Sequence, residues 1–98
     1  MIPENMDITS IEKEDVANCH FPHEEVLSDA DDRKLRAANI KKAEALGNIE
    51  HHKIAIVFED DKRVYKVTTT IWAAGEDNIV LKKGVIIPVA RIHKINLL

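Results

Sequence analysis

Short apolar runs separated by polar turns fill the second half of the chain, from about residue 52 to residue 97. Such runs, when they are rich in β-branched residues and bounded by Gly, Asp or Asn, are typical of antiparallel strands joined by tight turns. The pattern predicts five strands, at about 52–58, 63–73, 78–82, 85–88 and 92–97.

The second predicted strand, at about 63–73, is unusually long and carries apolar side chains on both of its faces. Because both faces then have to be covered, we expect the strand to bend and to serve two sheets, as barrel strands do. After Pro88 the apolar spacing changes from two residues to three, which predicts a 3₁₀ turn at about 88–91. We therefore expect a strongly bent antiparallel sheet or a small barrel. A flat open sheet is the alternative, and it would leave 85–89 as an unpaired apolar edge.

One helix is predicted before the strands, at about 29–46. Ser28 can cap a free backbone N–H at its start, and the acidic residues that follow suit the positive end of the helix dipole. Gly47 and Asn48 supply a left-handed stop. The stripe expected to face the sheet consists of Leu35, Ala38, Ala43 and Leu46, with Ile40 at its flank. One helix followed by five strands defines an α+β fold that is mainly β.

Charge divides the chain in two. Residues 1–32 contain ten acidic residues and one Lys, a net charge of −9, whereas residues 33–98 contain thirteen basic and seven acidic residues, a net charge of +6. Apolar residues are sparse in the acidic part, so we expect 1–27 to be weakly ordered, apart from one or two helical turns at 11–17 and the docking of Phe21. Residues 28–98 are expected to form a single helix-plus-barrel domain.

Composition disfavours several classes of protein. The single Cys excludes an internal disulfide, no apolar leader opens the chain, and no apolar run approaches the ~18 residues of a membrane span. We therefore expect a cytoplasmic protein without a membrane partner.

Chemistry-bearing residues are few. Cys19, His20 and His23, with His51 and His52, are the residues from which a metal site could be drawn, but they include no Cys-x-x-Cys pair, and adjacent His residues on a strand point apart. No nucleophile has a base placed beside it, and the three Gly residues form no phosphate-binding loop. We expect no metal, no cofactor and no catalytic residue, and thus no enzyme.

A candidate binding surface is predicted on the polar face of the long second strand and on the turns beside it. Trp72 is the only Trp of the chain, and an aromatic ring beside basic residues is the minimum for stacking a nucleobase; it would equally suit a peptide partner. The candidate residues are Lys66, Thr68, Thr70, Trp72, Lys82, Lys83 and Arg91.

The stretch Gly84–Ile95, preceded by a helix and a bent second strand, resembles the Sm-like and SH3-like small β-barrels. There it would form the end of strand four, the turn and strand five. The resemblance implies a small barrel and, for Sm-like proteins, assembly into rings by strand pairing and recognition of single-stranded RNA. The stretches Thr68–Trp72 and Asn78–Lys82 also resemble small uncharacterised bacterial proteins.

Two functions are expected from these observations. The first is a non-catalytic binding or assembly module that acts through a sheet face or an edge strand, with a protein or a second copy of the chain as its partner. The alternative is a small barrel that binds single-stranded nucleic acid and is modulated by its acidic N-terminal segment. Salt separates them, because nucleic-acid binding weakens steeply as salt concentration rises.

Overall fold

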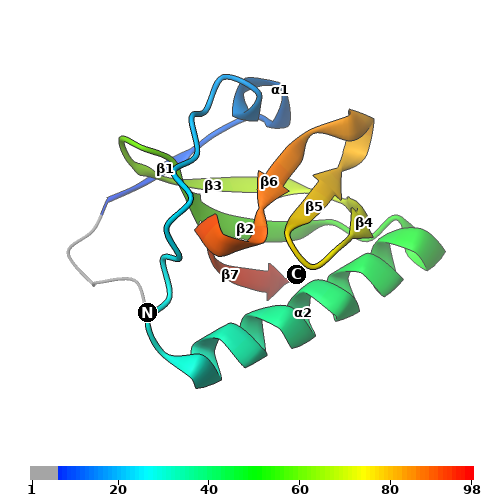
Figure 1. Cartoon of the computed structure of the whole chain (residues 1–98). Coiled ribbons are helices and arrows are strands. Elements are labelled where there is room, and N and C mark those ends of the chain that lie inside the picture. The colour runs from blue at the N-terminus through cyan, green and yellow to red at the C-terminus, as the bar shows by residue number, and fades with distance from the viewer. Residues whose placement is uncertain (1–6) are drawn as a thin grey trace.

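The structure is a computed structural model, and it describes residues 7–98. The first six residues of the predicted acidic segment lie outside the described residues. The elements, in chain order, are β1 (Ile8–Ser10), α1 (Lys13–Val16), α2 (Ala30–Glu50), β2 (Ile54–Glu59), β3 (Val64–Thr69), β4 (Ile71–Ala74), β5 (Asn78–Leu81), the 3₁₀ turn η1 (Lys82–Gly84), β6 (Ile86–Pro88), the 3₁₀ turn η2 (Val89–Arg91) and β7 (Ile92–Leu97) (Figure 1).

The strands form two sheets, with the orders β1-β3-β2-β7 and β4-β5-β6. All neighbours are antiparallel except β1 and β3, which are parallel. Only Thr70 separates β3 from β4, so the chain passes from one sheet to the other at a single bend. The long helix α2 runs along one side of the molecule, against β4 and β7, whereas α1 lies on another side, near β3 (Figure 1).

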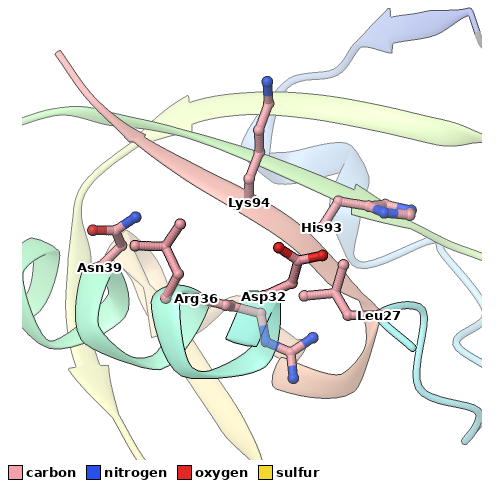
Figure 2. Close-up of a pocket in the computed structure, with 7 residues that line it drawn as sticks. Leu27, Asp32, Arg36, Asn39, His93 and Lys94 are labelled. Carbon is pink, nitrogen blue, oxygen red and sulfur yellow. The ribbon is translucent and has the colours of Figure 1, made fainter. Parts of the chain in front are cut away.

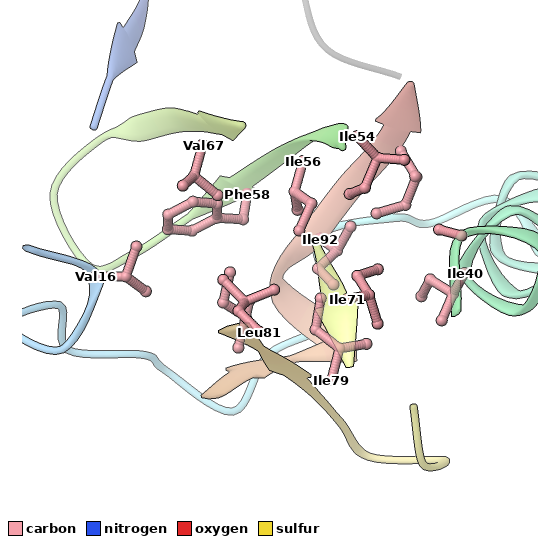
Figure 3. Close-up of a cluster of buried hydrophobic side chains, with 13 residues drawn as sticks. Val16, Ile40, Ile54, Ile56, Phe58, Val67, Ile71, Ile79, Leu81 and Ile92 are labelled. Carbon is pink, nitrogen blue, oxygen red and sulfur yellow. The ribbon is translucent and has the colours of Figure 1, made fainter. Parts of the chain in front are cut away.

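Aliphatic side chains fill the space between the two sheets (Figure 3). Val16 of α1 reaches this core from one end and Ile40 of α2 from the other, while the ring of Phe58 on β2 lies near Val67 of β3. The remaining buried members are Ala43, Ile54, Ile56, Val67, Ile71, Ile79, Leu81, Ile87, Ile92 and Ile95. In the part of the chain that the structure describes, no helix combines the length and the apolarity needed to cross a membrane.

The α+β class is confirmed, but the details differ from the prediction. Strand and helix make up similar shares of the fold, so it is not mainly β. Within residues 7–98 there are seven strands in two sheets that do not close into a barrel. The 3₁₀ turn is confirmed at Val89–Arg91 and the last strand at Ile92–Leu97, and that turn leaves β6 and β7 in different sheets.

The predicted strand at 63–73 is two strands, because Thr70 leaves the ladder between them. Its hydroxyl donates a hydrogen bond to the carbonyl oxygen of His51 at 3.3 Å, and its own carbonyl oxygen accepts one from the backbone N–H of Lys82 at 3.1 Å. These bonds direct the chain away from β2 and towards β5. The bounds of the other predicted strands agree with the observed ones to within two residues.

The predicted ends of the helix are wrong at both sides. Asp29, not Ser28, is the cap: its carboxylate accepts the N–H of Asp31 at 2.7 Å. The helix also continues through Gly47 and ends at His51, which adopts left-handed angles (φ 53°, ψ 35°). The N–H groups of His51 and of the next residue bond back to carbonyl oxygens of the last turn, as in a Schellman motif.

The buried stripe of α2 is Arg36, Ile40, Ala43 and Gly47, so Ala43 and the flanking Ile40 are confirmed while the rest of the predicted stripe is wrong. Leu35 is 61% exposed. Two contacts fix this rotation. Arg36 forms a two-pronged ion pair with Glu25, with N–O distances of 2.5 and 2.7 Å, and donates to the carbonyl oxygen of Ile92 at 3.0 Å. Gly47 lies directly against the backbone of β4, where no side chain fits.

Residues 7–27 follow the surface of the domain. β1 adds to the outer edge of β3 through backbone pairing alone, since all three of its side chains are exposed. The side chains of Val16 and Leu27 are buried, and the ring of Phe21 lies 6.0 Å from that of Phe58, which confirms its docking. The weak order expected of 1–27 stays a prediction.

Candidate functional site

A hollow of about 410 Å³ lies at the bend between β3 and β4, and we call it the basic hollow. Side chains from α1, the end of α2, β3, β4 and η1 meet there. The lining residues are Lys13, His51, Lys53, Thr68, Thr69, Thr70, Trp72 and Lys82.

Trp72 owes its position to an irregularity in β4. The register of β4 with β5 shifts between Ile71 and Ala73, so Trp72 stands outside the regular ladder. Such a bulge re-aims a side chain, and Trp72 is 46% exposed. A second, smaller hollow, lined by Gly47, Asn48, His51 and Trp72, adjoins the ring, so the ring separates two depressions.

The cations of the basic hollow are brought together by strand pairing. β2 pairs with β3 so that Ile54 lies opposite Thr69, which places Lys53 beside Thr70 at the end of the hairpin. Lys82 is held at the same point, because its N–H donates to the carbonyl oxygen of Thr70. The three Thr residues at 68–70 therefore line the hollow together with these two Lys residues.

Lys13 closes the hollow from the side of α1. Its ammonium group lies 3.1 Å from the carboxylate of Glu14, which points to the surface. The pKa of Glu14 is lowered from its usual value, first by a hydrogen bond from its own backbone N–H, then by the hydrogen bond from Lys13 and by the charges of Lys13 and Lys83.

The charge of the basic hollow has one sign. Three Lys side chains line it, and among residues 7–98 no Asp or Glu contributes to the lining. An exposed aromatic ring beside three cations and several hydroxyl groups suits a ligand that carries both negative charge and flat rings.

Four of the predicted surface residues meet in the basic hollow: Thr68, Thr70, Trp72 and Lys82. Lys66 is exposed on β3 and Lys83 is exposed on η1, where it adopts left-handed angles (φ 69°), but neither lines the hollow.

Arg91 does not belong to this surface. Its side chain is buried at the far end of β2, where it donates to the carbonyl oxygens of Glu59 at 3.0 Å, Glu24 at 2.8 Å and Asp60 at 3.2 Å. It is also 3.8 Å from the Glu59 carboxylate. With these partners Arg91 joins the N-terminal segment to the β2–β3 turn and has a structural role.

The prediction omitted four lining residues: Lys13, His51, Lys53 and Thr69. A signal for Lys53 was available, because the turn at 60–63 fixes the register of the hairpin, with Glu59 opposite Val64, and so puts Lys53 opposite Thr70. His51 was considered only as a metal ligand. Nothing in the sequence points to Lys13, which lies in a segment without apolar periodicity.

A second groove, of about 380 Å³, lies between α2 and β7 and is lined by Leu27, Asp32, Leu35, Arg36, Asn39, His93 and Lys94 (Figure 2). Its charges are mixed. Arg36 is already engaged by Glu25 and Ile92, and the buried His93 ring bonds through Nε2 to Glu59 at 2.9 Å. The basic hollow is the better candidate, because all the Lys, Asp and Glu side chains that residues 7–98 contribute to its lining are Lys, and Lys53 and Lys82 form no ion pair with those residues.

The described residues offer little for other chemistry. Among residues 7–98 no three His, Cys, Asp or Glu side chains come together in a way that could hold a metal ion. Burial raises the pKa of the Cys19 thiol to about 11, and the nearby Asp60 carboxylate adds to the effect, so the thiol stays protonated at neutral pH.

In comparisons with known proteins, the chain matches no protein-family model, no curated protein and no solved structure.

Proposed function

We propose that this chain is a non-catalytic binding module that takes single-stranded nucleic acid in the basic hollow. The observation that carries the proposal is the convergence of Lys13, Lys53 and Lys82 around the exposed Trp72, in a lining to which residues 7–98 contribute no carboxylate. Phosphates would lie against the ammonium groups, a base would stack on the ring, and the hydroxyl of the exposed Thr68 would bond to a sugar or phosphate oxygen. No step in this function requires a bond to form or break.

We further infer that the two sheets are an open variant of a small Sm-like or SH3-like barrel. Support comes from the strand order, in which β7-β2-β3 continues through the bend at Thr70 into β4-β5-β6. A 3₁₀ turn joins the last two strands, as in those barrels. This assignment concerns architecture, and the binding proposal does not depend on it.

The proposal can be tested by fluorescence anisotropy with labelled single-stranded oligo(U) and oligo(dT). Each phosphate neutralised on a single strand contributes about −0.7 to the slope of log K against log salt, so three cations give a slope near −2. Affinity should then fall about 20-fold between 50 and 200 mM salt. Because Trp72 is the only Trp, quenching of its fluorescence reports contact with the ring directly.

Point variants locate the site. Trp72→Ala should weaken binding about 5- to 150-fold, the range expected for loss of one stacked base, and Trp72→Phe should restore most of it. Lys82→Gln and Lys53→Gln should each reduce the salt slope by about 0.7. Lys62→Gln is the matched control, because Lys62 is exposed in the β2–β3 turn at the other end of the hairpin. Absence of any anisotropy change or quenching at low salt, or an equal effect of Lys62→Gln, would refute the proposal.

A second candidate, assembly through an edge strand, is favoured by one observation. β6 lies at the edge of its sheet, no strand within residues 7–98 pairs with its outer side, and its Ile86 side chain is 54% exposed. We propose that β6 would then pair with a second copy of the chain. Light scattering after size-exclusion chromatography should find an oligomer that Ile86→Lys dissociates and that Leu35→Lys, a change at another exposed apolar residue, leaves intact. A monomer at all concentrations would exclude this function.

A further inference from the structure

Glu14 shares its cationic partners with the basic hollow. The Glu14 carboxylate is 3.1 Å from the ammonium group of Lys13, which lines the hollow, and the charge of Lys83 acts on the same carboxylate. Glu14 itself is exposed and is not part of the lining. It therefore stands at the rim, where it holds one of the three lysines that a phosphate would need.

The position of this carboxylate is fixed by the fold. The N–H of Ile11 donates to the carbonyl oxygen of Lys66 at 3.0 Å, and the side chain of Val16 is buried in the core. These two anchors hold the short helix α1 on both sides of Lys13 and Glu14. The ion pair is thus presented by a supported element and not by a loose end.

We infer that Glu14 is a built-in competitor for the anionic ligand, occupying Lys13 until a phosphate group displaces its carboxylate. The inference rests on the proposed function and assigns a regulation to the same site. When ligand binds, the Lys13 ammonium exchanges a carboxylate partner for a phosphate oxygen, and Glu14 turns to solvent. Lys53 and Lys82 have no such partner among the interactions of the described chain, and they contribute their full charge from the start.

The expected size of the effect follows from the exposure of the pair. Ion pairs at the surface contribute little because water and salt screen them, and breaking one changes an equilibrium about 1.5- to 5-fold. Glu14→Gln should therefore tighten binding of oligo(U) by about that factor at low salt. The gain should shrink at higher salt, where the charges are screened over about 8–10 Å.

The test compares five variants, the first being Glu14→Gln, with the wild-type chain by fluorescence anisotropy at low salt. Glu24→Gln is the matched control: it removes the same charge from the same acidic segment, but Glu24 is exposed on the side where Arg91 lies. Lys13→Gln should weaken binding less than Lys82→Gln, because Lys13 first has to part from Glu14. The double variant Lys13→Gln, Glu14→Gln should bind no more tightly than Lys13→Gln alone, because Glu14 acts through Lys13.

The outcomes separate the two claims. If the wild-type chain binds and Glu14→Gln binds equally well, the inference is wrong while the proposed function stands. A gain of the same size in Glu24→Gln would also overturn it, since the effect would then be one of net charge. If neither the wild-type chain nor Glu14→Gln binds any single strand at low salt, the proposed function itself fails. Deletion of residues 1–27 is unsuitable, because it removes buried Val16 and Leu27 from the fold.

Discussion

Replacement of Gly47 by Ala tests the close approach of α2 to the backbone of β4. In an exposed helix this change stabilises the protein by roughly 0.5–1 kcal/mol, because Ala has the higher helix propensity. Here the added Cβ would lie 2.3 Å from the carbonyl oxygen of Ile71 and 3.0 Å from Cγ2 of Thr70. The nearest atom belongs to the backbone of β4 and cannot rotate away, so the end of α2 has to move outward.

Overpacking of this kind costs typically ~1–3 kcal/mol, and a clash with backbone belongs at the upper end of that range. After the gain in helix propensity is subtracted, Gly47→Ala should destabilise the fold by about 2 kcal/mol. For a domain of this size that lowers the Tm by roughly 8–16 °C. Urea unfolding should show a lower midpoint at unchanged m value.

The neighbouring exposed residue provides the control for this prediction. Asn48→Ala should stabilise the chain by about 0.5 kcal/mol, because it improves helix propensity without meeting β4. The emission of Trp72, which shares a hollow with both residues, should change in Gly47→Ala because the end of α2 has to move there. A Gly47→Ala protein as stable as the wild type would refute the close approach of α2 and with it the placement of the helix end beside the basic hollow.

Three further predictions concern the charged groups and the thiol. Burial tends to raise the pKa of Glu25, but hydrogen bonds, chiefly from Arg36, lower it below its usual value. Glu25 therefore stabilises the fold above pH ~4.3, and this contribution is lost as pH falls through the folded-state pKa. Glu25→Gln should cost about 1–3 kcal/mol at pH 7 and reduce the dependence of unfolding free energy on pH in acid, as measured by urea unfolding over a pH series. Cys19, whose thiol pKa is about 11, should react with iodoacetamide at pH 8 about two orders of magnitude more slowly than an ordinary thiol; an ordinary rate would contradict its burial beside Asp60. Arg91→Met should lower the free energy of unfolding by about 2–4 kcal/mol while leaving oligonucleotide affinity unchanged. A loss of affinity without loss of stability would contradict the structural role and indicate that Arg91 contacts the ligand.

Local periodicity was sufficient to place most elements of the fold. The alternation of apolar residues in 54–58 and the change of spacing after Pro88 both depend on neighbours in the sequence, and the structure has strands and a 3₁₀ turn there. The errors arose at residues whose role depends on distant partners. Arg36 and Gly47 both lie on the buried stripe of α2, Arg36 because of its ion pair and Gly47 because it has no side chain. A prediction made from apolar residues alone could not include them, and it placed Leu35 on the buried face instead.

The candidate site was predicted in part for the same reason. Thr68, Thr70 and Trp72 lie on one strand pattern, so their common location could be inferred from a short stretch of sequence. Arg91 was included because it is basic, but its hydrogen bonds to the backbone of residues far away in the sequence bury it away from this surface. Lys13 reaches the hollow only because β1 and α1 attach to β3, and no local pattern of the segment predicts that attachment.

The bonds made by residues 90–92 have a consequence for synthesis of the protein. The carbonyl oxygen of Ala90 accepts the N–H of Val26, and Arg91 and Ile92 bond to Glu24 and to the guanidinium group on α2. During synthesis, residues 11–29 therefore leave the ribosome long before residues 90–92, which are their hydrogen-bond partners. Until residues 90–92 emerge, the earlier segment cannot form its native contacts with them. We expect a stalled nascent chain that exposes residues up to 85 to be sensitive to proteases over residues 11–29, and one that exposes the whole sequence to be resistant there.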